Sequence, residues 1–407
     1  MNDSLGFWSD VAPVFRSGQP SLIDGVSWLR WLVWAVILFG ILPGIMAYLV
    51  WAERKVAGRF QDRIGPNRVG PFGLLQSIAD AIKLLTKENL VPGSADRWVH
   101  AIAPVLLLLS AFLMLVVIPF GASAAVNPPC GLLYLIAVSS LSPLAIFLAG
   151  WSSRNKFSLM GAMRAVAQLV SYEIPQVLAL VPIVLWSGSL SLVAIFDRQV
   201  DLGWFLFSPP GLLSFAIFTI ANIAELNRAP FDLPEAESEI VAGFHTEYSG
   251  MRWSLFFLGE YLGIFALAGL GSALFLGGGT LPLVGRWQVG GVESASGFVS
   301  LLSQGSLVVG FSFKVTLYIF FFFWVRATLP RIRVDRLMDF AWKYLVPLAL
   351  LNILISAVWF EVVIRPSAPN GFLGWLITAP LVVGSIVGIF AINRAALRVE
   401  SVAGQVP

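Results

Sequence analysis

The chain has 407 residues, of which 57% are hydrophobic and only 12% are Asp, Glu, Lys or Arg. Soluble domains carry about 25% charged residues, so this composition excludes a water-soluble enzyme of this length and predicts an integral membrane protein. With two His and one Cys, the chain lacks the roughly four Cys or His ligands that an iron–sulfur cluster or a structural zinc ion requires. We therefore expect no metal site in it, and any redox centre that acts on it must lie in a partner.

Apolar runs of about 20 residues recur along the whole chain, and each is long enough as a helix to cross a hydrocarbon layer about 30 Å thick. The runs are continuously apolar rather than alternating, which indicates helices and not the strands of a barrel. The predicted fold is all-α, a polytopic membrane helix bundle of about nine transmembrane helices. In chain order these cover residues 29–51, 100–120, 132–151, 159–186, 212–228, 253–276, 306–325, 344–364 and 372–392.

The distribution of basic residues predicts the orientation of the bundle, because Lys and Arg collect in cytoplasmic loops. Eight, three, two and five of them follow the first, third, fifth and seventh spans. The second, fourth, sixth and eighth spans are each followed by at most one. The odd-numbered loops are therefore predicted to be cytoplasmic. The N-terminus then lies outside, and nine spans return the C-terminus to the cytoplasm.

The first cytoplasmic loop combines mixed charge, sharp turns and an amphipathic helix. Acidic and basic residues alternate over residues 53–68, directly after the first span, and Gly and Pro residues then prescribe an irregular path. Over residues 72–87 the apolar side chains share one side of a helix, and Asp80 and Lys83 lie on the other, which predicts a surface helix. A simple positive anchor needs neither the acids nor the turns. The pattern therefore favours a shaped pocket at the level of the lipid headgroups.

Ionisable residues also occur inside four successive spans, where each charge costs at least about 2.5–3.5 kcal/mol and so calls for a role. They are Arg164 and Glu173 in the fourth span, Glu225 in the fifth, Glu260 in the sixth and Lys314 in the seventh. Buried ion pairs between helices are one explanation, but Arg164 and Lys314 cannot neutralise all of the acids. Carboxyl groups in a low-dielectric setting can exchange protons near neutral pH, so the set favours a proton relay with trapped water.

An acidic segment follows the fifth span, on the side where basic residues otherwise collect. Its acids are Glu225, Asp232, Glu235, Glu237, Glu239 and Glu247, against a single Arg228. Carboxylates can bind hard cations, but this spacing matches no calcium loop. The preferred interpretation is an acidic funnel that links the cytoplasmic pocket to Glu225 and Glu173.

Five blocks of the sequence resemble signatures of one family, the H-type membrane subunit of proton-pumping NADH:quinone oxidoreductase, which is respiratory complex I. The first block, residues 52–88, begins AERK..GR.Q.R.GPN.VGP. The others cover residues 150–173, 225–250, 256–261 and 326–343, and they include GWSS.NK, PFD.PE.E.E, FF.GEY and RATLPR.R.D.LM. The blocks run from the first to the eighth predicted span, so the resemblance covers most of the chain.

The resemblance implies a subunit without its own redox centre, located in a bacterial plasma membrane and surrounded by lipid. Such a subunit forms the membrane part of the chamber for ubiquinone or menaquinone and couples quinone reduction to proton translocation. NADH, FMN and iron–sulfur clusters are then expected in partner subunits. The implied partners are quinone-module subunits of the peripheral arm and antiporter-like membrane subunits, with no role for nucleic acid.

The family signatures also imply roles for individual residues. Those implied to line the quinone chamber or its entrance are Glu53, Arg54, Gln61, Arg63, Asp80, Lys83, Arg228 and Asp232. Those implied to carry the coupling signal are Glu173, Glu225, Glu235, Glu237, Glu239 and Glu260. We add the two membrane cations, Arg164 and Lys314, to the coupling set.

The chain departs from the family at its C-terminal end, because the family usually has eight spans. The predicted organisation is an N-terminal tail over residues 1–28 and an eight-helix core over residues 29–364, followed by an extra helix and tail over residues 365–407. Within the core, residues 52–97 form the quinone-site loop and residues 225–250 the acidic segment. Two alternative functions remain. A related membrane-bound hydrogenase anchor shares the coupling acids but no quinone, and a stand-alone ion-coupled transporter often has inverted repeats, of which we find none.

Overall fold

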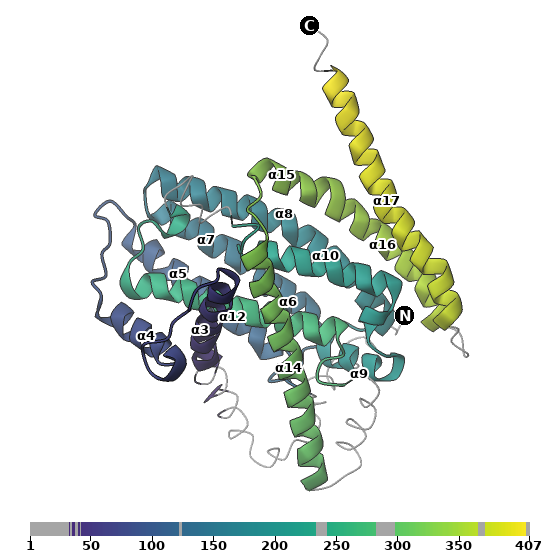
Figure 1. Ribbon diagram of the computed structural model, residues 1–407, viewed down its shortest axis with the longest axis horizontal. Helices are drawn as coiled ribbons and strands as arrows, with labels where there is room; N and C mark the ends of the chain where they lie inside the picture. The colour runs from purple at the N-terminus through teal and green to yellow at the C-terminus, as the bar shows by residue number, and fades with distance from the viewer. Residues whose placement is uncertain are drawn as a thin grey trace, which may run out of the picture.

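A computed structural model describes residues 42–121, 124–232, 242–281, 298–364 and 371–403, together with residues 32, 35, 36 and 40. Its regular elements are all helical, which confirms the predicted fold class (Figure 1). They are α3 (Leu42–Phe60), η3 (Pro71–Gly73), α4 (Gln76–Thr86), α5 (Arg97–Val117), α6 (Gly131–Ser139), α7 (Leu141–Ser152), α8 (Lys156–Ser187), α9 (Leu192–Leu202), η4 (Phe205–Phe207), α10 (Pro209–Glu225), η5 (Gly243–His245), α12 (Gly250–Phe275), α14 (Phe298–Thr328), α15 (Val334–Asp339), η6 (Phe340–Leu345), α16 (Val346–Trp359), η7 (Phe360–Ile364) and α17 (Gly371–Ala403).

Within the described part of the chain, seven helical stretches are long and apolar enough to cross a membrane. They are Arg97–Val117, Gly131–Ser152, Lys156–Ser187, Gly250–Phe275, Leu302–Thr328, Val334–Ile364 and Phe372–Arg394. These correspond to seven of the nine predicted spans and include the ninth. The fifth span is α10, whose 17 residues extend about 26 Å at 1.5 Å per residue. The first span is described mainly from Leu42 onward, and the tail over residues 1–28 lies outside the described residues.

The predicted third span is two helices, because α6 ends at Ser139 and α7 begins at Leu141. Pro143 lacks the backbone N–H that would bond to the carbonyl of Ser139 in a continuous helix. The hydroxyls of Ser139 and Ser140 also donate to the carbonyls of Ile136 and Ala137, at 2.9 Å each, and so compete with the helical ladder.

Helix α9 was not predicted, and it lies between the fourth and fifth spans. The Ser191 hydroxyl caps its start by accepting from Ala194 N. Leu192, Ile195 and Gln199 face inward at helical spacing. Gln199 then ties α9 to the end of α12, since its amide donates to Ala273 O at 2.8 Å. A short helix of this kind has a weaker sequence signal than a membrane span.

The first charged segment differs from the predicted loop, because α3 continues to Phe60. Ala, Glu, Arg and Lys are good helix formers, so the helix runs on past the apolar span. Glu53 and Arg54 therefore stand on α3 and not in a loop. The predicted surface helix is present as α4, but it begins only at Gln76, after the left-handed backbone of Phe72 and Gly73.

The centre of the bundle is formed by α5, α7, α8, α10 and α12, which run in similar directions in Figure 1. Helix α12 packs against α5, α10 packs against α8, and α7 contacts both α5 and α8. Helices α3 and α14 cross this group steeply and contact α12 (Figure 1). On another side, α17 packs against α16 and then extends beyond the bundle (Figure 1). Segments distant in sequence therefore meet around α12.

Candidate functional site

A buried ion cluster forms where α3, α12, α14 and the turn after α10 meet. Its centre is Glu53, which is 6% exposed. Glu53 accepts hydrogen bonds from Arg228 Nη1 at 3.2 Å and from the hydroxyl of Tyr261 at 2.5 Å. Arg326 on α14 forms a second ion pair with the same carboxylate. One acid of the first predicted pocket is therefore held by side chains from three other parts of the fold.

Arg228 connects this cluster to a second acid. Its Nε lies 2.6 Å from an oxygen of Glu260 on α12, while its Nη1 reaches Glu53. The guanidinium also lies over the ring of Tyr261, 4.7 Å from the ring centre, a cation–π contact. One guanidinium thus pairs with carboxylates from two different helices through two of its nitrogens, which the single ammonium nitrogen of a lysine cannot reproduce.

The end of α10 explains why Arg228 points into the cluster. Asn227 adopts the left-handed conformation, with φ of 50°. Asn227 N donates to Ala224 O at 3.2 Å, and Arg228 N donates to Ile223 O at 3.4 Å. These two bonds define a Schellman motif, which stops the helix and reverses the chain. The turn therefore places Arg228 against α3 and α12 immediately after Glu225.

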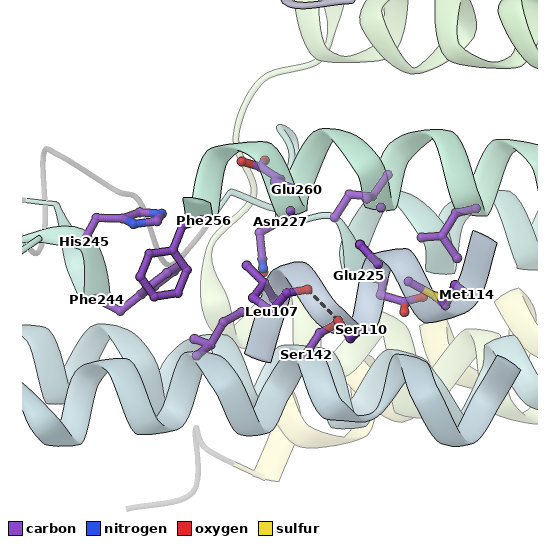
Figure 2. A pocket seen from close by; sticks show the side chains of 16 residues that line it. Leu107, Ser110, Met114, Ser142, Glu225, Asn227, Phe244, His245, Phe256 and Glu260 are labelled. Carbon is purple, nitrogen blue, oxygen red and sulfur yellow. Dashed lines mark hydrogen bonds between the residues drawn. The ribbon is translucent and has the colours of Figure 1, made fainter. Parts of the chain in front are cut away.

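A cavity of about 60 Å³ lies beside the cluster, between α5, α7, α10, α12 and η5. Both Glu225 and Glu260 line it, as do Ser110, Ser142 and His245 (Figure 2). The two serine hydroxyls lie 3.1 Å apart. A polar space needs about 10–15 Å³ for one water, so this cavity has room for several. Glu260 thus borders the cavity, while its carboxylate pairs with Arg228.

Glu225 is held from the other side by α8. Gln176 donates from its Nε2 to the Glu225 carboxylate and, at 2.9 Å, to Asn222 Oδ1. Glu173, three residues earlier on α8, is close enough to interact electrostatically with Glu225. The structure therefore places two of the predicted coupling acids, Glu260 and Glu225, at one cavity and a third, Glu173, within electrostatic range of Glu225.

The remaining predicted chamber residues on α3, α4 and the turn between them lie at the surface. Arg54 on α3 pairs with Asp80 on α4 at 2.7 Å. Arg63 donates to Gln61 at 2.7 Å in the turn after α3. Lys83 lies on an exposed face of α4. These five residues form a polar surface group, separate from the buried cluster.

The acidic segment is described only at its two ends. Arg331 Nε donates to the backbone carbonyl of Asp232 at 2.8 Å, which ties the segment to the loop between α14 and α15. Glu235, Glu237 and Glu239 lie outside the described residues. The predicted funnel through them is therefore still a prediction.

Of the two predicted membrane cations, Lys314 lies at the far end of α12. Lys314 Nζ donates to the carbonyls of Leu276, Gly278 and Thr280, so it caps the far end of α12. It also lies 4.1 Å from the centre of the Trp204 ring. These contacts satisfy carbonyls that a helix end leaves open and place a positive charge at its negative end. Arg164 lies on α8, and the role of both cations in proton coupling is still a prediction.

Sequence reasoning missed several members of the site. Tyr261 and Arg326 bind Glu53, and Gln176, Ser110 and Ser142 surround Glu225, yet none was named as a candidate. Tyr261 and Arg326 do lie inside the blocks that carry the family resemblance, which could have revealed them. The serines and the glutamine carry no such signal, because buried hydroxyls and amides are common in membrane helices.

Gly161 on α8 sets the position of η5, which closes one end of the cavity. A Cβ at Gly161 would lie 2.6 Å from Gly243 Cα and 3.1 Å from Phe244 N. Gly161→Ala should therefore push η5 off α8 and destabilise the protein by about 1–3 kcal/mol, seen as a lower melting temperature. Gly384→Ala on α17 is the control, because a Cβ there meets no atom within 4 Å. Equal melting temperatures would contradict the close contact.

Comparison with known proteins identifies the family. A family model described as NADH dehydrogenase matches residues 33–357. The chain is 47% identical over 347 residues to the H-type subunit of NADH-quinone oxidoreductase from Dehalococcoides mccartyi, covering 85% of this chain and 91% of that one. It is also 47% identical over 363 residues to the corresponding protein of Geobacillus kaustophilus, covering 88% of this chain and 98% of that one. The corresponding protein of Syntrophotalea carbinolica is 46% identical over 342 residues, which are 81% of this chain and 96% of that one.

The fold is that of a polytopic membrane protein, and the family match makes it a subunit of a membrane-bound oxidoreductase. The chain belongs to the family of H-type subunits of NADH-quinone oxidoreductase. This confirms the predicted resemblance, the location in a membrane and the membership of a proton-translocating oxidoreductase complex with other complex I subunits as partners. Among the described residues, no group of three or more His, Cys, Asp or Glu could hold a metal ion.

Proposed function

We propose that this subunit forms one wall of the quinone chamber of complex I and passes the coupling signal from that chamber into the membrane arm. The observation that supports this is the double role of Glu260. It pairs with Arg228, and so with the Glu53 cluster, and it also lines the cavity that Glu225 lines. A change of charge at the cluster would therefore act on a residue that also borders the cavity.

The chamber wall consists of the buried residues Glu53 and Arg228 together with the polar surface group and Asp232. Its members are Glu53, Arg54, Gln61, Arg63, Asp80, Lys83, Arg228 and Asp232. The space inside the ion cluster is about 10 Å³, which is too small for a quinone ring because one water alone needs that much. The quinone, ubiquinone or menaquinone, therefore binds against this wall and not within the cluster. Peripheral-arm subunits complete the chamber and carry the NADH, FMN and iron–sulfur sites.

The proton relay runs from Glu260 through water in the cavity to Glu225 and then to Glu173. Ser110 and Ser142 supply hydroxyls that can both donate to and accept from these waters. Beyond Glu173 the signal passes to antiporter-like neighbours. Glu235, Glu237 and Glu239 extend the relay on the chamber side, and Arg164 and Lys314 adjust its charge.

The sidedness of this arrangement follows from the basic residues. Residues 52–99, 152–164 and 326–343, at the ends of the first, third and seventh spans, hold 16 of the 26 Lys and Arg residues and so face the cytoplasm. The chamber and its peripheral-arm partners then lie on the cytoplasmic side of a bacterial plasma membrane. The C-terminal end of α17 reaches the same side, and the N-terminus lies outside.

Changing Glu225 to Gln tests the proposed function. The amide keeps the size of the side chain but cannot take up and release a proton, so NADH:quinone reduction and linked proton uptake in inverted membrane vesicles should fall about five- to tenfold. NADH oxidation by a hydrophilic artificial acceptor should persist, because it bypasses this subunit. Glu361→Gln is the control, since Glu361 lies in η7, just after α16, and does not line the cavity. Unchanged quinone reduction in the Glu225 variant would refute the proposal.

A further inference from the structure

Gln176 on α8 joins two residues that share one face of α10. It is 7% exposed, and its Nε2 donates to both Asn222 Oδ1 and Glu225 Oε2. Asn222 and Glu225 are three residues apart, so they lie one above the other on the helix. A side-chain amide has two N–H donors, and both are therefore used between α8 and α10.

These contacts restrict how the Glu225 carboxylate can turn. Hydrogen bonds to a charged acceptor are stronger than those between neutral groups, so the bond from Gln176 holds Oε2 toward α8. Asn222 is fully buried. It accepts the second hydrogen bond from the Gln176 amide and so fixes the plane of that amide. The Gln176 amide contacts Oε2 and not Oε1, and Glu225 lines the cavity, so Oε1 is the oxygen that this bond leaves available to the cavity. Without the amide, the carboxylate would be free to leave this orientation.

We propose that Gln176 is a positioning residue for proton transfer, which aims one oxygen of Glu225 at the cavity and keeps the other near α8. This inference rests on the proposed coupling role of Glu225. Gln176 itself takes up no proton, because a side-chain amide does not titrate near neutral pH. It acts only through the orientation of the Glu225 carboxylate.

A double-mutant cycle tests this role. Gln176→Met keeps the length of the side chain and removes its donors, and it should lower quinone reduction and linked proton uptake about three- to fivefold. Glu225→Gln alone should lower quinone reduction and proton uptake further than Gln176→Met does. On the Glu225→Gln background, Gln176→Met should cause no further loss, because its effect passes through the carboxylate that is already absent.

Asn352→Leu is the matched control for the cycle. Asn352 on α16 is also a buried amide that binds α10, since it donates to Pro210 O at 3.0 Å and to Ser214 Oγ at 2.7 Å. It does not line the cavity. Any loss that it causes should therefore multiply with the loss from Glu225→Gln, as expected for independent sites.

The outcomes separate this inference from the proposed function. If Glu225→Gln leaves quinone reduction unchanged, the proposed coupling role fails, and the inference with it. If Glu225→Gln lowers the rate but Gln176→Met has no effect, or multiplies with it as Asn352→Leu does, only the inference fails. Should Gln176→Met prevent assembly, Gln176→Asn replaces it in the same cycle. The Asn amide is one methylene too short to reach both Asn222 and Glu225. The outcomes that support or overturn the inference are the same as for Gln176→Met.

Discussion

Glu53→Ala should abolish quinone reduction by the assembled enzyme, with a loss of at least about twentyfold, because breaking a buried ion pair by removing one partner costs about 3–5 kcal/mol. The change removes the carboxylate shared by Arg228 and Arg326, whose side chains are 10% and 39% exposed. The two guanidinium groups would then lie close together without the carboxylate that both of them bind. The measurement is NADH:quinone reductase activity in membranes, with native electrophoresis to follow assembly.

Asp339→Asn provides the comparison for Glu53. Asp339 pairs with Lys343 at 3.0 Å one turn along the helix, and both side chains are nearly half exposed. Such surface pairs contribute only about 0–1 kcal/mol, so activity and assembly should be close to those of the unmodified enzyme. Near-normal quinone reduction in the Glu53 variant would show that the ion cluster is not needed for activity.

The second large effect is expected for Arg228, where even a change to Lys should impair quinone reduction. Arg228→Lys should lower quinone reduction at least about tenfold, and Arg228→Met further, because one of the two carboxylates would lose its ion pair with residue 228 at a cost of more than about 1.4 kcal/mol in a buried site. Lysine keeps the charge but cannot pair with Glu53 and Glu260 through two nitrogens of one group.

Steady-state kinetics in membrane vesicles would measure this change, together with the ratio of protons moved to quinone reduced. Arg336→Lys is the control, because Arg336 lies on the exposed surface of α15. A fully active Arg228→Lys variant would indicate that charge alone matters. The geometric part of the proposal would then be wrong.

Much of the fold was predictable because membrane helices carry their signal locally. About twenty apolar residues in succession specify a span without reference to the rest of the chain. The errors occurred where local composition competes with position in the bundle. Helix α3 runs past its apolar part since Glu53 and Arg54 suit a helix, and Pro143 divides a run that hydropathy alone reads as one.

The candidate site was predictable in its members but not in its pairing. Charge at membrane depth marked Glu225 and Glu260 as unusual, and the mixed charge after the first span included Glu53. The family resemblance then assigned Glu53 and Arg228 to the quinone chamber. The bond between Glu53 and Arg228 joins residues 175 positions apart, and no local pattern contains that information. Lys314 shows a second limit. Its three acceptors are backbone carbonyls, and because every residue has one, the sequence does not show which carbonyls Lys314 binds.

The turn at Asn227 makes the length of α10 part of the site. Each residue added to an α-helix rotates the next side chain by about 100°, since a turn takes 3.6 residues. One inserted residue before Asn227 would swing Arg228 away from Glu53 and Glu260 or turn Glu225 away from the cavity. Substitutions that preserve the turn can be absorbed by packing, whereas insertions and deletions cannot. Among relatives, we therefore expect the spacing between Glu225 and Arg228 to vary less than the identities of the residues around them.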